Sequence, residues 1–292
     1  MQIQPTCVPC IFDDLEGALR LLVDDPAIVH RVMQQALSLL ADDYSRREVP
    51  SYYITEVHRA LKRITHIDLP FADLRRKAND VGIEIAQRLV LPSDPQERFA
   101  HLVRWAIAGN CLDFRTVGTG YDMSIETMHR LLAEHVARGL HVDHTGEILT
   151  AVKDARRILY VLDNVGEIAF DKLLIQELQT YAPVVATVRG GPITSDATMD
   201  DAVQVGLDAV VPLILAGPDT LGISLTEMSD QLRRELDRAD LVITKGQANY
   251  YVMDEYRHRA PQKIACLFTT KCDLVSADFG LTGKVNIAAL LS

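Results

Sequence analysis

The sequence predicts an α/β fold in which helices flank a mostly parallel sheet and a helical region precedes it. After about residue 150, short aliphatic runs of strand length alternate with amphipathic helical stretches. Strands separated by helices form βαβ units, and near-continuous apolar runs are typical of strands buried on both faces. Before residue 150, helical patterns dominate and strand-like alternation is scarce.

The first half of the chain is predicted to be helical throughout. Amphipathic periodicity predicts helices over 29–40, 53–63, 74–90, 99–107 and 124–138. Ser124 has the side chain of an N-cap for the last of these. The acidic stretch 13–16 predicts the first turn of another helix, where the helix dipole favours acids.

The second half supplies the sheet. Strands are predicted over 158–162, 184–188, 209–211, 241–244 and 264–267, and the helices between them over 167–178, 198–205 and 227–239. We therefore expect a mainly helical region over residues 1–125 and an α/β domain over residues 126–292.

Composition limits the classes of function. The chain has 292 residues, a formal net charge of −10 and a pI of about 5.4. This balance argues against nucleic acid as a partner, because phosphate backbones are met by basic faces. It leaves small phosphorylated ligands open, since a few local cations can hold one phosphate.

We expect a cytoplasmic protein that does not enter the membrane. The sequence has no run of about 18 apolar residues, and its start lacks the basic and apolar regions of a signal peptide. The five cysteines are an odd number, which favours thiols or metal ligands over a disulfide framework.

Acids and amides follow two successive strands. Asp163 and Asn164 come directly after strand 158–162, and Asp196 follows strand 184–188 and a glycine turn. Ligands of open α/β sheets bind at the carboxyl ends of the strands, so these oxygens can converge on one Mg²⁺ or Mn²⁺ ion. In the competing interpretation, Asp163 and Asn164 form a turn and Ser195 or Asp196 caps the helix near Thr198.

Two lysines follow later strands. Lys245 directly follows strand 241–244, and Lys271 comes shortly after strand 264–267. Both are therefore candidates to hold an anionic ligand. Asn249 is a candidate to bind sugar hydroxyl groups. The alternatives are a polar loop that begins a helix and ordinary surface lysines.

Two polar motifs lie in the helical half. Asn110 and Asp113 follow helix 99–107, where Gly109 and Asn110 form a common helix terminator, but both side chains are also candidates to reach the sheet crevice. Cys7 and Cys10 form a Cys-x-x-Cys pair that is compatible with a second metal site, a redox pair or simple packing.

The ordered set of these motifs resembles the DUF89 family, the damage-control phosphatases related to ARMT1. The resemblance is carried by Cys7-Val8-Pro9-Cys10, the segment 108–114, Asp163-Asn164-Val165-Gly166-Glu167, the segment 195–198, Lys245-Gly246-Gln247-Ala248-Asn249-Tyr250, and Lys271-Cys272. It covers nearly the whole chain and is strongest for the prokaryotic branch that carries the Cys-x-x-Cys pair.

The resemblance implies a Rossmann-like domain and a divalent-metal-dependent phosphatase of sugar phosphates or damaged phosphorylated metabolites. It implies that Asp163, Asn164 and Asp196 bind Mn²⁺, Mg²⁺, Co²⁺ or Ni²⁺, and that Lys245 and Lys271 meet phosphate. Ser195 and Tyr251 depart from the family pattern, in which an asparagine and an acid are expected. Metal-assisted attack by water is the expected mechanism, with Asp163 as a nucleophile left open.

Two other classes of function compete with the phosphatase. One is a non-catalytic regulatory protein that binds a metal or ligand. The other is an S-adenosylmethionine-dependent carboxyl methyltransferase, which the fold permits but the single glycine after strand 158–162 disfavours. The sequence does not determine the oligomeric state.

Overall fold

The computed structural model describes residues 1–114 and 124–291. Its helices are α1 (Cys7–Leu22), α2 (Pro26–Asp43), α3 (Pro50–Thr65), α4 (Ala72–Gln87), α5 (Pro95–Ala108), α6 (Ile125–Ala137), α7 (Thr145–Asp154), α8 (Ile168–Leu178), α9 (Met199–Val205), α10 (Asp230–Arg238), α11 (Gln247–Tyr256) and α12 (Asp273–Asp278). Short 3₁₀ turns cover Tyr44–Arg46, Gly109–Leu112 and Arg257–Arg259. The strands are β1 (Val142–Asp143), β2 (Ile158–Val161), β3 (Val184–Val188), β4 (Leu213–Leu215), β5 (Leu241–Lys245), β6 (Lys263–Thr269) and β7 (Asn286–Leu291).

The described strands form one sheet in the order β1-β7-β6-β5-β2-β3-β4. Strands β4, β3, β2, β5 and β6 run parallel, and β7 runs antiparallel to β6. Strand β2 is central, and all of its residues are buried. The predicted α/β fold class with a mostly parallel, helix-flanked sheet is thereby confirmed.

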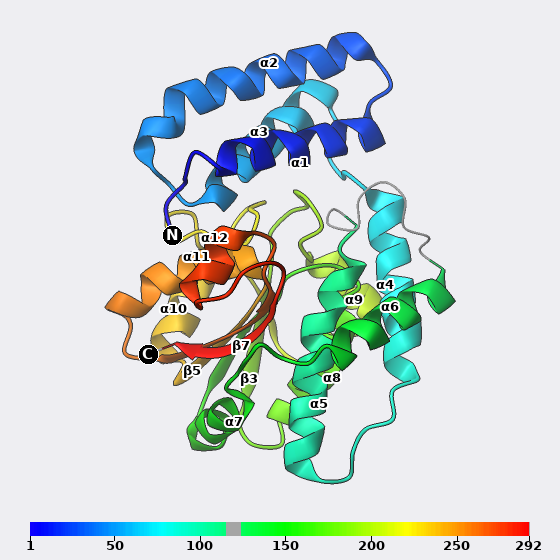
Figure 1. Ribbon diagram of the computed structural model, residues 1–292, viewed down its shortest axis with the longest axis vertical. Coiled ribbons are helices and arrows are strands. Elements are labelled where there is room, and N and C mark those ends of the chain that lie inside the picture. The colour runs from blue at the N-terminus through cyan, green and yellow to red at the C-terminus, as the bar shows by residue number, and fades with distance from the viewer. Residues whose placement is uncertain (115–123, 292) are drawn as a thin grey trace.

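Successive residues of the central strands face two different cores. Ile158 and Tyr160 point to one hydrophobic cluster, whereas Leu159 and Val161 point to the other. This is the two-residue period of a strand buried on both faces. Helices α4, α5, α6, α8 and α9 lie together on one side of the sheet, and α10, α11 and α12 lie on the opposite side (Figure 1).

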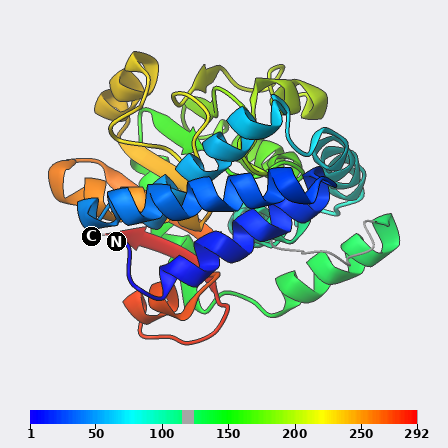
Figure 2. The same ribbon diagram turned by 90° about the horizontal axis from the view of Figure 1, so that it is seen from above.

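Helices α1, α2 and α3, which we call the N-terminal layer, cross above the carboxyl ends of the parallel strands (Figures 1 and 2). Ion pairs fasten this layer to the loop between β4 and α10. Lys62 Nζ lies 2.7 Å from Asp219 Oδ2, and Arg59 Nη2 lies 3.0 Å from Glu227 Oε2. The layer therefore roofs the edge of the sheet at which a ligand is expected.

Several predicted elements need correction. Residues 209–211 form a turn rather than a strand, because Pro212 interrupts the run and the edge strand forms only at Leu213, opposite Ala186. Strands β1 and β7 were not predicted from the sequence. The acids at 13–16 lie beyond the first turn of α1, which begins earlier, at Cys7.

The cap of α9 also differs from the prediction. Thr198 and Asp201 form a capping box at its start, so neither Ser195 nor Asp196 caps this helix. By contrast, Ser124 caps α6 as predicted, accepting a hydrogen bond from the backbone of Thr127.

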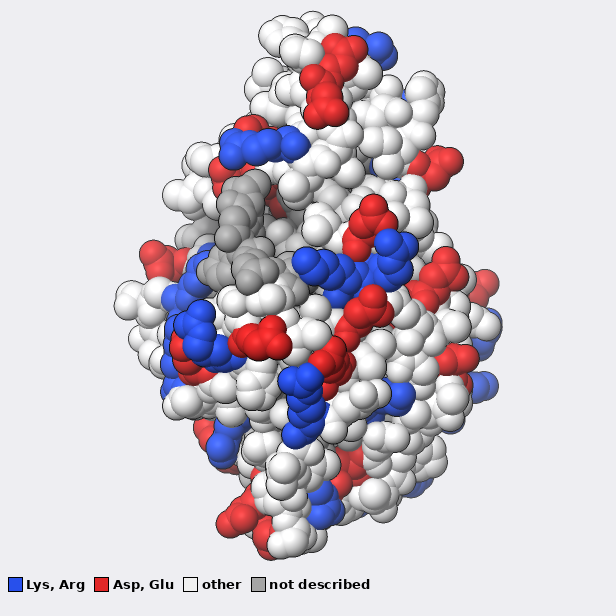
Figure 3. All heavy atoms as spheres, turned by 90° about the vertical axis from the view of Figure 1, so that its right-hand side faces the viewer, with Lys and Arg blue, Asp and Glu red and all other residues white. Residues whose placement is uncertain are grey.

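The division at residue 125 stays a prediction. Helices α4 and α5, which precede it, pack against α8 of the α/β half. Of the helices that the structure describes, none is long and apolar enough to cross a bilayer. On the face shown in Figure 3, basic and acidic side chains are interspersed.

Candidate functional site

A cavity of about 710 Å³ lies between the N-terminal layer and the carboxyl ends of the strands. Its walls come from α1, α3, α11, α12 and the loops that follow β2, β3 and β6. This is the edge at which parallel sheets bind their ligands. Of the site residues predicted from the sequence, the cavity wall includes Asp163, Asn164, Asp113, Lys271 and the cysteine pair.

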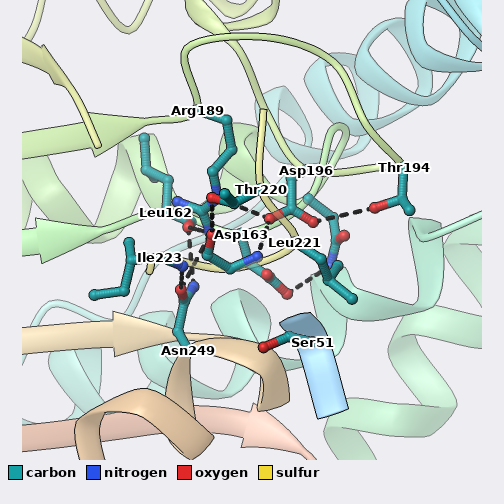
Figure 4. A network of polar contacts seen from close by, with 12 residues as sticks. Ser51, Leu162, Asp163, Arg189, Thr194, Asp196, Thr220, Leu221, Ile223 and Asn249 are labelled. Carbon is teal, nitrogen blue, oxygen red and sulfur yellow. Dashed lines mark hydrogen bonds and ion pairs between the residues drawn. The ribbon is translucent and has the colours of Figure 1, made fainter. Parts of the chain in front are cut away.

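The loops after β2 and β3 are joined, as predicted from the strand-end residues. Ala197 donates its backbone N–H to the Asp163 carbonyl at 2.7 Å, and Asn164 forms an isolated β-bridge with Asp196. Ser195 Oγ donates to Asn164 Oδ1 at 2.8 Å. The backbone therefore brings the segments of the three predicted oxygen ligands together, and Figure 4 shows two of them, Asp163 and Asp196.

Gly246 makes room for the Asp163 side chain. It follows β5 with a φ of +79°, and a Cβ atom at this position would lie 2.0 Å from Asp163 Oδ2. Only glycine satisfies both the left-handed backbone and this close approach.

Asp163 is a buried carboxylate among other acids. Burial raises its pKa well above the ordinary value, and the charges of Glu167 and Asp196 raise it further. Among the described residues, no lysine or arginine forms an ion pair with it. A bound cation would relieve this crowding of negative charge.

Asp196 is held from behind by Arg189. Its Oδ2 accepts hydrogen bonds from Arg189 Nε and from the Gly222 backbone N–H, both at 2.8 Å (Figure 4). Within the described residues, its Oδ1 accepts a hydrogen bond only from Thr194 Oγ1, at 3.4 Å. Asp196 can therefore serve a metal through Oδ1 alone.

Lys245 does not face the cavity, although it was predicted to hold an anionic ligand. Its ammonium group donates to the Ala106 carbonyl at 2.8 Å, to Asp171 Oδ1 at 2.8 Å and to Glu167. All three N–H groups are thus used, the residue is fully buried, and the cavity wall does not include it. Lys245 is a positioning residue: it fixes Glu167, which in turn accepts a hydrogen bond from Asn164 at 3.2 Å.

Asn249 and Asn110 also support the site from behind. Asn249 bonds to Arg189, to the Ile223 backbone and to the carbonyl oxygens at the ends of β2 and β5, and it has no exposed surface. Asn110 donates to Glu167 Oε2 at 3.2 Å. Neither lines the cavity, so direct contact with a sugar or phosphate does not fit either side chain.

Lys271 and Asp113 face the cavity as a pair. Lys271 Nζ lies 2.8 Å from Asp113 Oδ2. Burial would lower the pKa of Lys271, but the charges of Asp113 and Asp163 outweigh it and the pKa is raised. Lys271 therefore carries a full positive charge at neutral pH beside the Asp163 carboxylate.

Helix N-termini add positive potential. The first turns of α1, α3 and α11 supply the cavity-lining residues Cys7, Cys10, Pro50, Ser51, Gln247 and Ala248. None of these three helices has a side-chain hydrogen bond at its N-cap. The positive ends of these helix dipoles at the cavity wall favour an anion.

The cysteine pair opens α1 at the cavity wall. Cys7 is buried and Cys10 is exposed. Cys272, at the start of α12, lines the same cavity. Burial raises the pKa of the Cys7 thiol, which keeps it protonated. Within the described part of the chain, no three His, Cys, Asp or Glu side chains are arranged to hold a metal ion.

A divalent metal nevertheless fits the strand-end cluster. Asp163 and Asn164 line the cavity, and Asp196, which is fully buried and does not line it, is joined to Asn164 through the backbone. Carboxylate and amide oxygens suit a hard cation that keeps several waters and takes only one or two carboxylates from the protein. The structural observation that supports this fit is Asp163, a buried carboxyl group crowded by Glu167 and Asp196 and without an ion-pair partner among the described residues.

Comparison with known proteins places the chain in a family. The profile of the damage-control phosphatase ARMT1-like domain matches residues 3–285. The chain belongs to this family. The resemblance drawn from the sequence motifs is thereby confirmed.

Relatives match along almost their whole length. An uncharacterised protein from Methanocaldococcus jannaschii is 32% identical over 98% of this chain and 95% of its own. A damage-control phosphatase from Archaeoglobus fulgidus is 32% identical over 96% of each chain. The crystal structure of a DUF89 family protein from Pyrococcus horikoshii matches with a TM-score of 0.88 and 27% identity over the full length of both chains. The relatives named damage-control phosphatases support a phosphatase role.

Sequence reasoning missed several residues of this family member's site. Glu167 stood within the quoted Asp163 motif, and Arg189 within the glycine turn, but neither was assigned a role. Both are charged residues close to the end of a buried strand, and this position could have marked them as members of the site. Lys284, which also lines the cavity, follows a loop that no motif marked.

Proposed function

We propose that this chain is a divalent-metal-dependent phosphomonoester hydrolase of small phosphorylated metabolites. The relatives support the phosphatase chemistry, and the cavity supports its dependence on a metal. Mn²⁺, Mg²⁺, Co²⁺ and Ni²⁺ are the candidates, with sugar phosphates and damaged phosphorylated metabolites as the starting substrate panel.

The negative charge of the cavity wall is the observation that supports a bound metal. Among the residues that the structure describes, five acids line it, Asp13, Asp14, Asp113, Asp163 and Asp273, against two lysines, Lys271 and Lys284. A phosphate ester would therefore enter a site of the same sign. A divalent cation at Asp163 would reverse the local potential, as bound metals do in phosphate sites.

The roles of the residues follow from their positions. Asp163, Asn164 and Asp196 Oδ1 are the proposed metal ligands, and the metal would supply Lewis-acid polarisation of the phosphoryl group. Lys271, oriented by Asp113, holds a phosphoryl oxygen. The N–H groups at the starts of α3 and α11 take further negative charge. Arg189 and Lys245 keep the cluster in place through Asp196 and Glu167.

The test is phosphate release from an aryl phosphate and a panel of sugar phosphates. The full chain is treated with EDTA and each metal is added back. We expect metal-restored turnover in the native protein and a loss of at least about a hundredfold in Asp163→Ala, the scale of losing a central electrostatic group. The matched control is Asp73→Ala, which removes an exposed acid on α4.

Two outcomes would contradict the proposal. Near-native turnover in Asp163→Ala would remove Asp163 from the chemistry. Tight metal binding without turnover of any phosphate ester would favour the regulatory protein. Binding of S-adenosylmethionine without metal would favour the methyltransferase instead.

Water attack and attack by Asp163 itself predict different trapped species. In the first, water attacks the phosphorus in line while Asp163 remains a metal ligand. In the second, a carboxylate oxygen of Asp163 attacks the phosphorus, the P–O ester bond breaks, and the alcohol leaves after taking up a proton; water then hydrolyses the aspartyl-phosphate to inorganic phosphate and the free carboxylate. Phosphate analogues such as metal fluorides would be bound and the complex solved by crystallography. An adduct bonded to Asp163 Oδ would overturn water attack.

A further inference from the structure

The cavity changes in polarity from its floor to its roof. At the floor, on the carboxyl ends of the strands, lie Asp163, Asn164, Ser195, Asp113 and Lys271. Further lining residues come from α1, α3, α11, α12 and the loop before α10, and those that are apolar or aromatic are Ile11, Pro50, Ile54, Leu221, Tyr251 and Leu274.

Three of these apolar side chains are incompletely covered by the protein. Ile54, Leu221 and Leu274 are half-buried and border the cavity from α3, the β4–α10 loop and α12. They come from segments distant in the sequence that meet around one space. Apolar surface left uncovered inside a concave site is the usual contact surface for the organic part of a ligand.

Asp13, Asp14 and Asp273 also lie among these lining residues, but Gln247, Tyr251 and Cys7 present uncharged groups between the apolar side chains. Gln247 Nε2 donates to the Tyr251 hydroxyl, and burial raises the pKa of that hydroxyl, so the ring faces the cavity uncharged. Cys7 is kept as a thiol by its raised pKa. A protonated buried cysteine behaves as a small apolar side chain, so Cys7 adds to the apolar lining.

The size of the cavity exceeds what a phosphate group needs. Its volume of about 710 Å³ lies within the range of sites that enclose a whole small organic ligand, roughly 300–1,000 Å³. A compact polyol would occupy only the floor and leave Ile54, Leu221 and Leu274 in contact with water.

We propose that the physiological substrate is an amphipathic phosphomonoester, whose phosphate lies on the polar floor and whose apolar alkyl, acyl or aryl group lies against Ile54, Leu221 and Leu274. This inference rests on the proposed phosphatase function and narrows its substrate class. It makes these three residues determinants of specificity rather than of chemistry.

The experiment measures kcat/KM for ethyl, butyl, hexyl and octyl phosphate on the metal-loaded full chain. The reactivity of the ester bond is nearly constant in this series, so the change in kcat/KM reports contacts of the chain. We expect an increase approaching about fourfold per methylene group that becomes buried. Glucose 6-phosphate and glycerol 3-phosphate serve as polar comparisons and should fall below octyl phosphate.

Variants locate the contact. Leu274→Asn and Ile54→Asn should flatten the dependence of kcat/KM on chain length. Ala277→Asn adds a polar group at an exposed cavity-lining position with little risk to folding, and should flatten it as well. Leu37→Asn, at an exposed leucine of α2, is the matched control and should keep the native slope.

The outcomes separate this inference from the function on which it rests. Turnover of all esters with no dependence on chain length, or a preference for glucose 6-phosphate over octyl phosphate, would overturn the amphipathic substrate while leaving the phosphatase intact. If the dependence of kcat/KM on chain length is the same in the native protein and in all three cavity variants, the apolar group does not bind at these residues and the assigned contact is wrong. Absence of phosphate release from every ester with every metal would overturn the phosphatase itself.

Discussion

At the scale of single residues, Gly246 and Asp163 depend on each other. The carboxylate occupies the space where any other residue would place its Cβ atom, and the positive φ of Gly246 adds a backbone cost for any replacement. The glycine is thus required by the site rather than by the strand that precedes it.

Gly246→Ala should displace the Asp163 carboxylate. We expect at least about a hundredfold loss of kcat and a stability loss of roughly 1–3 kcal/mol, from strain and contact together. Gly139→Ala is the matched control, because Gly139 also has a positive φ of +72° but nothing lies within 4 Å of its added Cβ. Thermal unfolding and phosphate release measure both effects. Equal losses in the two variants would show that only backbone strain matters.

Asp171 should make stability depend on pH. Burial raises its pKa to about 6, and the charge of Lys245 only partly opposes this. Because the folded state then binds more protons than the unfolded state between about pH 4 and 6, stability should fall as pH rises through this window. The raised pKa corresponds to about 3 kcal/mol at most.

Asp171→Asn should remove this component. Urea unfolding of the native protein and the variant between pH 4 and 7 gives the difference in slope. If the difference in unfolding free energy between the native protein and the variant does not change with pH, the raised pKa of Asp171 is contradicted. The pH-independent loss of a partner for Lys245 does not affect this comparison, because only the slope is used.

At the scale of elements, polar contacts help to attach the N-terminal layer to the loops above the sheet. Asp219 accepts hydrogen bonds from Arg59 Nε at 3.1 Å and from Lys62 Nζ at 2.7 Å, and Lys62 also donates to the Pro192 carbonyl at 2.9 Å. These contacts hold α3, and with it the first-turn N–H groups that border the cavity.

Asp219→Ala should loosen the layer without unfolding the sheet. For partly buried ion pairs we expect a loss of about 1 kcal/mol, or roughly fivefold faster amide exchange in α1–α3. Hydrogen exchange with mass-spectrometric detection resolves the elements. The control Asp73→Ala breaks an exposed pair within α4 and should leave α1–α3 unchanged. Unchanged exchange in Asp219→Ala would show that apolar contacts alone hold the layer.

At the scale of the whole molecule, metal binding should couple to stability. The protein carries a net charge of −10, and its cavity gathers carboxylates that repel one another in the absence of a cation. A ligand that binds only the folded state stabilises it in proportion to the logarithm of its concentration.

Saturating Mn²⁺ should raise the melting temperature. At a hundredfold excess over the dissociation constant the gain is about 2.7 kcal/mol, or several degrees for a chain of this size. Asp163→Asn should remove the increase, whereas Cys10→Ser should retain it. An increase lost in Cys10→Ser and kept in Asp163→Asn would instead place the metal at the cysteine pair. Differential scanning calorimetry provides the measurement.

The sequence by itself determined the pattern of elements and the strand-end acids. The apolar runs of β2, β3, β5 and β6 are read from local composition, because strands buried on both faces carry few polar residues. The same pattern located Asp163, Asn164 and Asp196, since a parallel sheet gathers its carboxyl ends at one edge. Strand β1, with two residues, was too short to carry such a signal.

Only the tertiary structure decided which charged residues face the ligand. Lys245 and Lys271 look alike in the sequence, each after a buried strand. Lys245 still belongs to β5 and points to the same face as Leu241 and Ile243, where Glu167 and Asp171 bind it. Lys271 lies beyond the end of β6 and turns into the cavity beside Asp113. The alternation of side chains along the strand and the acidic partners from distant segments decide where each lysine points. Neither is visible in a local motif.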